Sequence, residues 1–94
     1  MRDALLNLFL ERFENWAKQN PHKVEEFREK LHKNFGIKGP EDAENSWLTL
    51  WLHIQKMAEK FRMTEEDFIE SVFTEDKKHR LDFFTGEREF ERIQ

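Results

Sequence analysis

The chain has 94 residues, enough for one domain with a single hydrophobic core spanning residues 1–94. Charged residues make up 38% of the sequence and give a net charge of −4, while apolar residues still account for 37%. The aromatic share of 14% argues against a disordered chain, and the lack of cysteine excludes disulfides and thiol nucleophiles. No apolar run approaches the ~18 residues of a membrane span, and the first residues do not resemble a signal peptide. We therefore expect a soluble, cytoplasmic protein.

Charge is unevenly distributed along the chain. Residues 1–39 carry 8 basic and 6 acidic side chains, residues 40–76 carry 3 and 10, and residues 77–94 carry 5 and 4. An acidic middle segment with a net charge of −7 thus lies between two nearly neutral ends. A general nucleic-acid-binding protein is expected to show the opposite pattern, a concentrated basic stripe.

Two helices are predicted in the first part of the chain. Apolar residues recur every three or four positions over 5–17, after Asp3 as an N-cap. Asn20 ends this helix, because the residue before a proline avoids the α region. The second helix is predicted to start with Asn20 as its N-cap and Pro21 at the first helical position, and to end at Gly36. Such closely spaced helices are expected to form an antiparallel hairpin or to meet at a sharp corner.

A longer helix is predicted in the middle of the chain. Apolar residues keep a period of about 3.5 residues over 43–61. Two starts are open: Pro40 as the first residue of a longer helix, or Ser46 as the N-cap of a shorter one. A fourth helix is predicted over residues 64–73, because Thr64 can cap it and an acidic first turn follows.

The last stretch of the chain changes its hydrophobic period. Its apolar residues are Leu81, Phe83, Phe84, Phe90 and Ile93, with Thr85-Gly86 between them. This pattern is typical of two short strands around a tight turn. The alternative is that residues 87–92 form a helical turn. The predicted fold class is therefore mainly α, with four helices and a short C-terminal β-hairpin in a winged-helix-like arrangement.

The sequence contains no convincing catalytic or metal-binding motif. Two acid–histidine pairs, Glu29 with His32 and Asp76 with His79, have the spacing found in helical metal sites. Both are interpreted as solvated surface pairs, because two ligands alone do not hold a metal ion. His53 has no acid or hydroxyl partner nearby in the sequence and is interpreted as a partly buried residue rather than a general base. We therefore expect no cofactor, no metal site and no enzymatic active site.

One basic run stands out near the end of the chain. It contains Lys77, Lys78 and Arg80, which are placed to contact a phosphate backbone beside a hairpin wing. The favoured alternative is a solvated cluster that neutralises the acidic residues just before it.

The predicted middle helix carries more apolar residues than one face can hold. Trp47 and Trp51 lie one turn apart and are interpreted first as core. A hydrophobic interface is the alternative, since tryptophan is enriched at interface hot spots. Leu48 and Leu52 add apolar surface on a second face. Because so short a chain has little material to cover these faces, we predict a homodimer.

The second half of the chain has a pattern found in one enzyme family. Its elements are Thr-Glu-Glu at 64–66, Asp76-Lys77-Lys78, Arg80 after one extra residue, the closing Ile93-Gln94, and Ser46-Trp47 near the place of a Gly-Trp pair. In these elements, residues 46–94 resemble the N-terminal winged-helix lobe of RNA 2′-phosphotransferases. The catalytic Arg-His pair of that lobe has no match, since His32 is out of register, and the NAD-binding lobe is absent. The resemblance implies a winged-helix-like fold and not the activity.

The charge of the predicted fourth helix directs the functional hypothesis. In a winged helix this element enters the major groove, yet here it carries Glu65, Glu66, Asp67 and Glu70 and no basic residue. Because such a surface repels phosphates, we predict a non-enzymatic protein-binding module, an adaptor or inhibitor, with a basic protein partner. Phage-encoded inhibitors of host nucleic-acid enzymes are an analogy in size and charge. The alternatives are a nucleic-acid-binding winged helix that uses its hairpin and basic run, and a small accessory subunit of a multi-chain enzyme.

Overall fold

The computed structural model describes residues 3–39 and 42–88. Its helices are α1 (Ala4–Gln19), α2 (Val24–Phe35), α3 (Trp47–Phe61) and α4 (Glu65–Val72). The prediction of a mainly α-helical protein with four helices is therefore confirmed. None of the helices in the described residues is long and apolar enough to cross a membrane.

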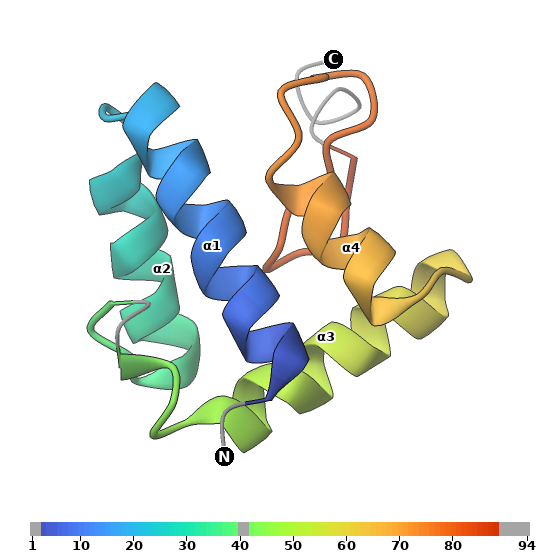
Figure 1. Cartoon of the computed structure of the whole chain (residues 1–94), viewed down its shortest axis with the longest axis horizontal. Coiled ribbons are helices and arrows are strands. Elements are labelled where there is room, and N and C mark those ends of the chain that lie inside the picture. Colours follow the sequence, from blue (N-terminus) through green and yellow to red (C-terminus); the bar gives the residue numbers. More distant parts are fainter. Residues whose placement is uncertain (1–2, 40–41, 89–94) are drawn as a thin grey trace.

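The first two helices form an antiparallel hairpin (Figure 1). Asp3 caps α1 as predicted, because its Oδ1 accepts a hydrogen bond from the Leu5 amide at 2.7 Å. The predicted role of Asn20 at the start of the next helix is wrong. Its side-chain amide instead donates to Trp16 O at 2.9 Å, which satisfies a carbonyl at the end of α1. A turn over residues 21–23 follows, and α2 begins only at Val24.

The other two helices pack against each other, and α4 joins them to α1. Figure 1 shows α3 running across one end of the α1–α2 pair, and α4 packs on both α1 and α3. Helix α3 starts directly after Ser46, so the shorter of the two predicted helices is the one that forms. Thr64 caps α4 as predicted, since its Oγ1 accepts a hydrogen bond from the Asp67 amide at 3.0 Å.

The centre of the core is filled by a residue that belongs to no helix, Phe83. Its ring is 2% exposed and contacts rings from all four helices. The ring centroids lie 5.5 Å away for Phe9 of α1, 6.1 Å for Phe27 of α2, 4.9 Å for His53 of α3 and 6.0 Å for Phe68 of α4. Edge-to-face and offset ring contacts of this kind add to the stabilisation that burial provides. The segment 81–84 is therefore part of the core.

The predicted C-terminal hairpin is not found as a pair of strands. Within the described part of the chain, its only ladder contact is one isolated antiparallel bridge between Leu81 and Arg88. Asp82 Oδ1 accepts hydrogen bonds from the amides of Phe84 and Thr85, at 2.9 and 3.0 Å, and so turns the chain before a strand can continue. Phe90 and Ile93 of the predicted second strand lie outside the described residues. The winged-helix arrangement is therefore not confirmed.

Candidate functional site

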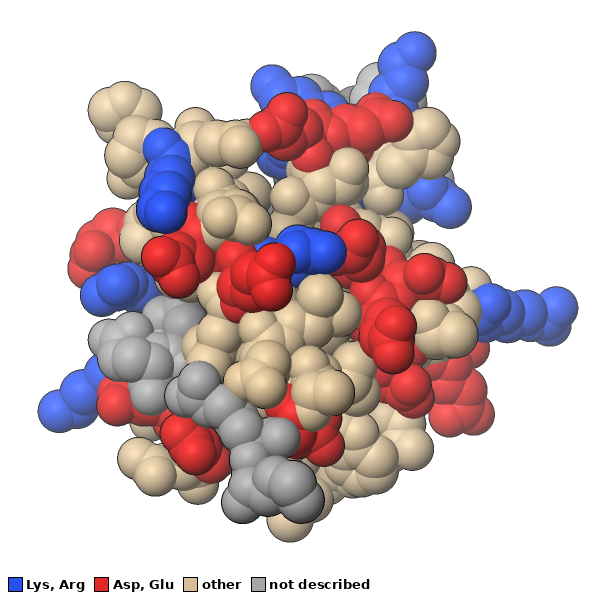
Figure 2. All heavy atoms as spheres, in the orientation of Figure 1, with Lys and Arg blue, Asp and Glu red and all other residues tan. Residues whose placement is uncertain are grey.

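An acidic surface covers α4 and the neighbouring part of α1. We define it as Glu11, Glu65, Glu66, Asp67 and Glu70. All of these are exposed except Glu65, which is half-buried. Figure 2 shows Asp and Glu side chains gathered over α4 and the adjoining stretch of α1. The four α4 residues predicted to form this surface are thus brought together, and α1 extends it by one carboxylate.

One arginine ties the two helices of the acidic surface together. Arg12 of α1 forms an ion pair with Glu70 of α4 and a second one with Glu11, at 2.9 Å. Its hydrogen bond to Glu70 raises the pKa of Arg12. Glu70 lies in the second half of α4, where the helix dipole disfavours a carboxylate. Arg12 compensates for that position, whereas Glu66 and Asp67 lie in the first turn, where the dipole stabilises them.

The basic run does not form a single cationic surface. Lys77 and Lys78 are exposed, but Arg80 is only 7% exposed and its Nε donates to Thr74 O at 2.8 Å. Asp76 is hydrogen-bonded to His79, with 2.6 Å between Oδ2 and Nδ1, and this bond lowers the pKa of Asp76. These contacts favour the interpretation of a solvated cluster that neutralises neighbouring acids. Phosphate contact by the three cations together would require Arg80 to leave its buried position.

An apolar ridge lies on the outer face of α3. Leu48 is 68% exposed and Leu52 is 51% exposed, and these are the exposed large apolar residues of the described chain. Trp51 is half-buried beside them, three residues after Leu48. Trp47 is also half-buried and packs against the core, so the core interpretation suits it better than Trp51. We call Leu48, Trp51 and Leu52 the α3 ridge.

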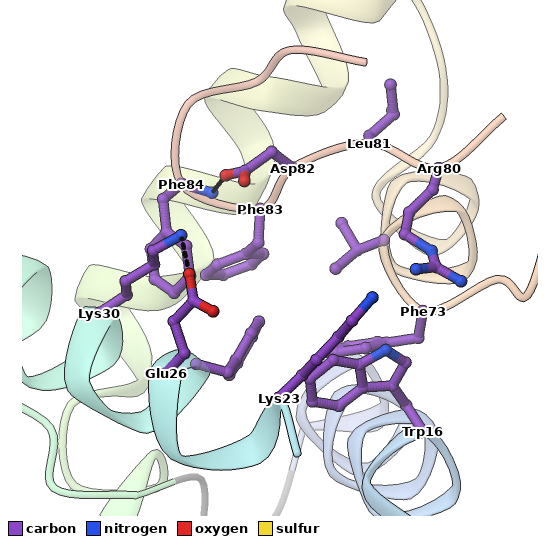
Figure 3. A pocket seen from close by; sticks show the side chains of 12 residues that line it. Trp16, Lys23, Glu26, Lys30, Phe73, Arg80, Leu81, Asp82, Phe83 and Phe84 are labelled. Carbon is purple, nitrogen blue, oxygen red and sulfur yellow. Dashed lines mark hydrogen bonds and ion pairs between the residues drawn. The ribbon is translucent and has the colours of Figure 1, made fainter. Parts of the chain in front are cut away.

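A pocket of about 310 Å³ lies between α2 and the segment 72–84 (Figure 3). Five aromatic residues line it, namely Trp16, Phe27, Phe73, Phe83 and Phe84. Its charged residues are Lys23, Glu26, Lys30, Arg80 and Asp82. This pocket could not be predicted from the sequence, because each of its aromatic residues has a spacing that is equally typical of core.

His53 is a partly buried residue, as predicted. Its Nε2 lies 2.5 Å from Phe83 O, and because a carbonyl only accepts, Nε2 must carry the hydrogen. Its ring also contacts Phe35, with 5.1 Å between the centroids. Burial lowers the pKa of His53, Lys56 adds to this effect, and the backbone hydrogen bond opposes it. The position therefore favours the neutral imidazole.

No group of three metal-ligating side chains comes together among residues 3–39 and 42–88. The predicted acid–histidine pairs lie on the surface, where Glu29, His32, Asp76 and His79 are all exposed. Comparison of the chain with protein-family models, with curated proteins and with solved structures found no match. The resemblance of residues 46–94 to the RNA 2′-phosphotransferase lobe therefore stays a prediction.

Proposed function

We propose that the protein is a non-enzymatic protein-binding module that presents its acidic surface to a basic partner. The observation that carries this proposal is the composition of α4, whose exposed side chains Glu66, Asp67 and Glu70 include no cation. The arginine that pairs with this surface in the described part of the chain, Arg12, is shared between Glu11 and Glu70. The surface therefore keeps an excess of negative charge, which attracts basic partners and repels nucleic acid.

The acidic surface has a structural role only in part. Carboxylates in a first helical turn stabilise the helix, which accounts for Glu66 and Asp67 without any partner. Glu70 gains nothing from the dipole, and like charges four residues apart, as in Glu66 and Glu70, destabilise a helix by a few tenths of a kcal/mol, roughly. The ion pair with Arg12 offsets part of this cost, and the repulsion that remains between Glu66 and Glu70 is better explained by binding than by folding.

Neutralising the acidic surface tests this proposal. In the double variant Glu66→Gln, Asp67→Asn, we expect the affinity for an oligolysine peptide to fall about five- to tenfold at low salt, since each exposed pair contributes roughly 0.2–1 kcal/mol. Raising the salt concentration should weaken binding of the unchanged protein, because exposed charges are screened. The measurement is fluorescence anisotropy of the labelled peptide.

The matched control removes the same charge elsewhere. Glu25 and Glu29 are exposed on α2, and Glu25 also lies in a first turn. The double variant Glu25→Gln, Glu29→Gln should therefore leave most of the peptide affinity in place. An equal loss in both double variants would show that net charge alone attracts the peptide, and would contradict a defined acidic surface.

Self-association is a second candidate function, favoured by the α3 ridge. Two leucines one turn apart, Leu48 and Leu52, are more than half exposed, and Trp51 lies beside them. Single exposed apolar residues are ordinary, but a row of them on one helix face is typical of an interaction site. A second copy would cover the ridge with the same ridge, as two-fold dimers do.

Light scattering across a concentration series tests self-association. We expect the mass to rise from 11.6 kDa toward twice that value at micromolar concentrations. The double variant Leu48→Gln, Leu52→Gln should stay monomeric, while Lys33→Gln, an exposed change on α2, should not alter the transition. A mass of 11.6 kDa at every concentration would exclude a homodimer.

The nucleic-acid-binding alternative stays a prediction and has a simple test. Its three cations are Lys77, Lys78 and Arg80, of which Arg80 is buried. A gel shift with duplex DNA and with RNA at low salt measures whether the remaining cations suffice. Binding tighter than the ~1–100 μM range of non-specific contacts would favour this alternative over the acidic surface as the main function.

A further inference from the structure

A second pocket, of about 470 Å³, lies between the end of α2, the second half of α3 and the turn at 84–85. We call it the α3 pocket. Its volume is within the roughly 300–1,000 Å³ range of small-ligand sites. Two lysines of α3, Lys56 and Lys60, line it, and no Asp or Glu of the described residues does. The wall is therefore cationic, although the whole chain has a net charge of −4.

Neither lysine of the α3 pocket forms an ion pair with a residue in the described part of the chain. Lys56 and Lys60 are four residues apart on one helix, so their side chains are neighbours and their like charges repel. Lys60 lies against the turn that closes the pocket, since a Cβ placed on Gly86 would lie 3.4 Å from Lys60 Nζ. An anion between the two ammonium groups would relieve their repulsion.

Two neutral residues of the same pocket, Asn34 and Thr85, keep hydrogens that they can donate. Thr85 Oγ1 accepts a hydrogen bond from the Glu87 amide at 3.2 Å, and its own hydroxyl hydrogen is not used by that bond. Asn34 Nδ2 donates one of its two hydrogens to Lys30 O at 2.8 Å. The pocket thus offers both charged and neutral donors. A phosphate group matches such a set, because it carries several strong acceptor oxygens.

The rest of the wall is partly apolar. Phe35 and Phe84 are both half-buried at the pocket, with 6.1 Å between their ring centroids. A bare phosphate ion would leave the exposed parts of these rings in water, whereas a small apolar group attached to the phosphate would cover them. The pocket therefore suits a phosphate ester better than the free ion.

We propose that the α3 pocket binds a small organic phosphate, with its phosphate oxygens at Lys56 and Lys60 and its apolar part against Phe35 and Phe84. The site goes beyond the proposed protein-binding function, because none of its lining residues belongs to the acidic surface or to the α3 ridge. An uncharged molecule of the same shape would gain the apolar contacts alone. The pocket should therefore select the anion.

Titration of the isotope-labelled full chain, followed by the shifts of its backbone amides in NMR spectra, tests this site. The probes are phenyl phosphate, inorganic phosphate and phenol, with sodium chloride added to keep the ionic strength constant. We expect saturable shifts at amides of residues 34–35, 56–60 and 84–86. Phenyl phosphate should bind about fivefold or more tightly than phenol, as expected for two exposed ion pairs. It should also bind about threefold more tightly than inorganic phosphate, because only its ring covers apolar surface.

Two double variants separate the site from the general charge of the chain. Lys56→Gln with Lys60→Gln should weaken phenyl phosphate about five- to tenfold and leave phenol unchanged. Lys23→Gln with Lys38→Gln removes the same charge from exposed lysines that do not line the α3 pocket, and should change neither affinity. The proposal would be overturned by an equal loss in both double variants or by saturable shifts confined to other residues. Equal affinity for phenyl and inorganic phosphate, or no saturable shift at tens of millimolar phenyl phosphate, would overturn it as well.

Discussion

His53 lies between α3 and the buried turn at Phe83, and this position determines its proton affinity. The ring is half-buried against Phe35 and Phe83 and donates from Nε2 to the Phe83 carbonyl. Burial lowers the pKa of His53 below its ordinary value of 6.5. The folded protein therefore binds a proton at this residue less readily than the unfolded chain does.

Stability should accordingly depend on pH through His53. The pKa of His53 is lower in the folded protein than in the unfolded chain, where it is about 6.5. The neutral ring therefore contributes its full share of stability above about pH 6.5, and this share is lost as the pH falls from there toward the folded pKa. We expect the free energy of unfolding, measured by urea titration, to decrease between about pH 7.5 and pH 5. His53→Gln should flatten this decrease, whereas His32→Gln, an exposed histidine, should preserve it. A pH dependence unchanged by His53→Gln would contradict the assignment.

Helix ends were predictable where a side chain acts on its own helix. Asp3 and Thr64 each accept a hydrogen bond from an amide of the first turn, and such caps depend on local sequence alone. Asn20 had two local roles available, since its amide can donate to the helix before it or its oxygen can accept from the helix after it. The sequence does not decide between these roles, and the chain uses the first.

The C-terminal segment shows why strand patterns are less reliable than helix patterns. Alternating apolar residues predicted a hairpin, yet Asp82 captures two amides and bends the chain into a turn. Gly86 completes this turn with a φ of +69°, and a side chain there would meet Met57 Sδ at 2.6 Å. What decides the conformation is the fit of Phe83 among four helices, and such a long-range contact is not encoded in local periodicity.

At the scale of the molecule, one candidate site could be predicted from the sequence and the other could not. The acidic surface was predictable, because four of its residues, Glu65 to Glu70, lie within one helix whose composition is visible in the sequence. The pocket was not, because Trp16, Lys23 and Arg80 come together only when the segment 72–84 folds back against α1 and α2. Burial of Arg80 had no signal either, since Arg80 closes a run of exposed polar residues, Lys77, Lys78 and His79.

Phe83 should be the residue on which the whole fold depends most. It is fully buried and contacts rings from all four helices, so its removal leaves a cavity that no single helix can fill by moving. We expect Phe83→Ala to lower the free energy of unfolding by about 3–5 kcal/mol. Since small domains are stable by only about 5–15 kcal/mol, this variant should lose a large part of the stability of the fold.

The neighbouring ring provides the matched control for this prediction. Phe84 is half-buried at the pocket, so Phe84→Ala should cost clearly less than Phe83→Ala while leaving the same backbone turn in place. Urea unfolding followed by circular dichroism measures both variants, and an unchanged slope would show that each affects stability and not the surface exposed on unfolding. Equal losses in the two variants would mean that the turn as a whole, rather than the buried Phe83 ring, holds the four helices together.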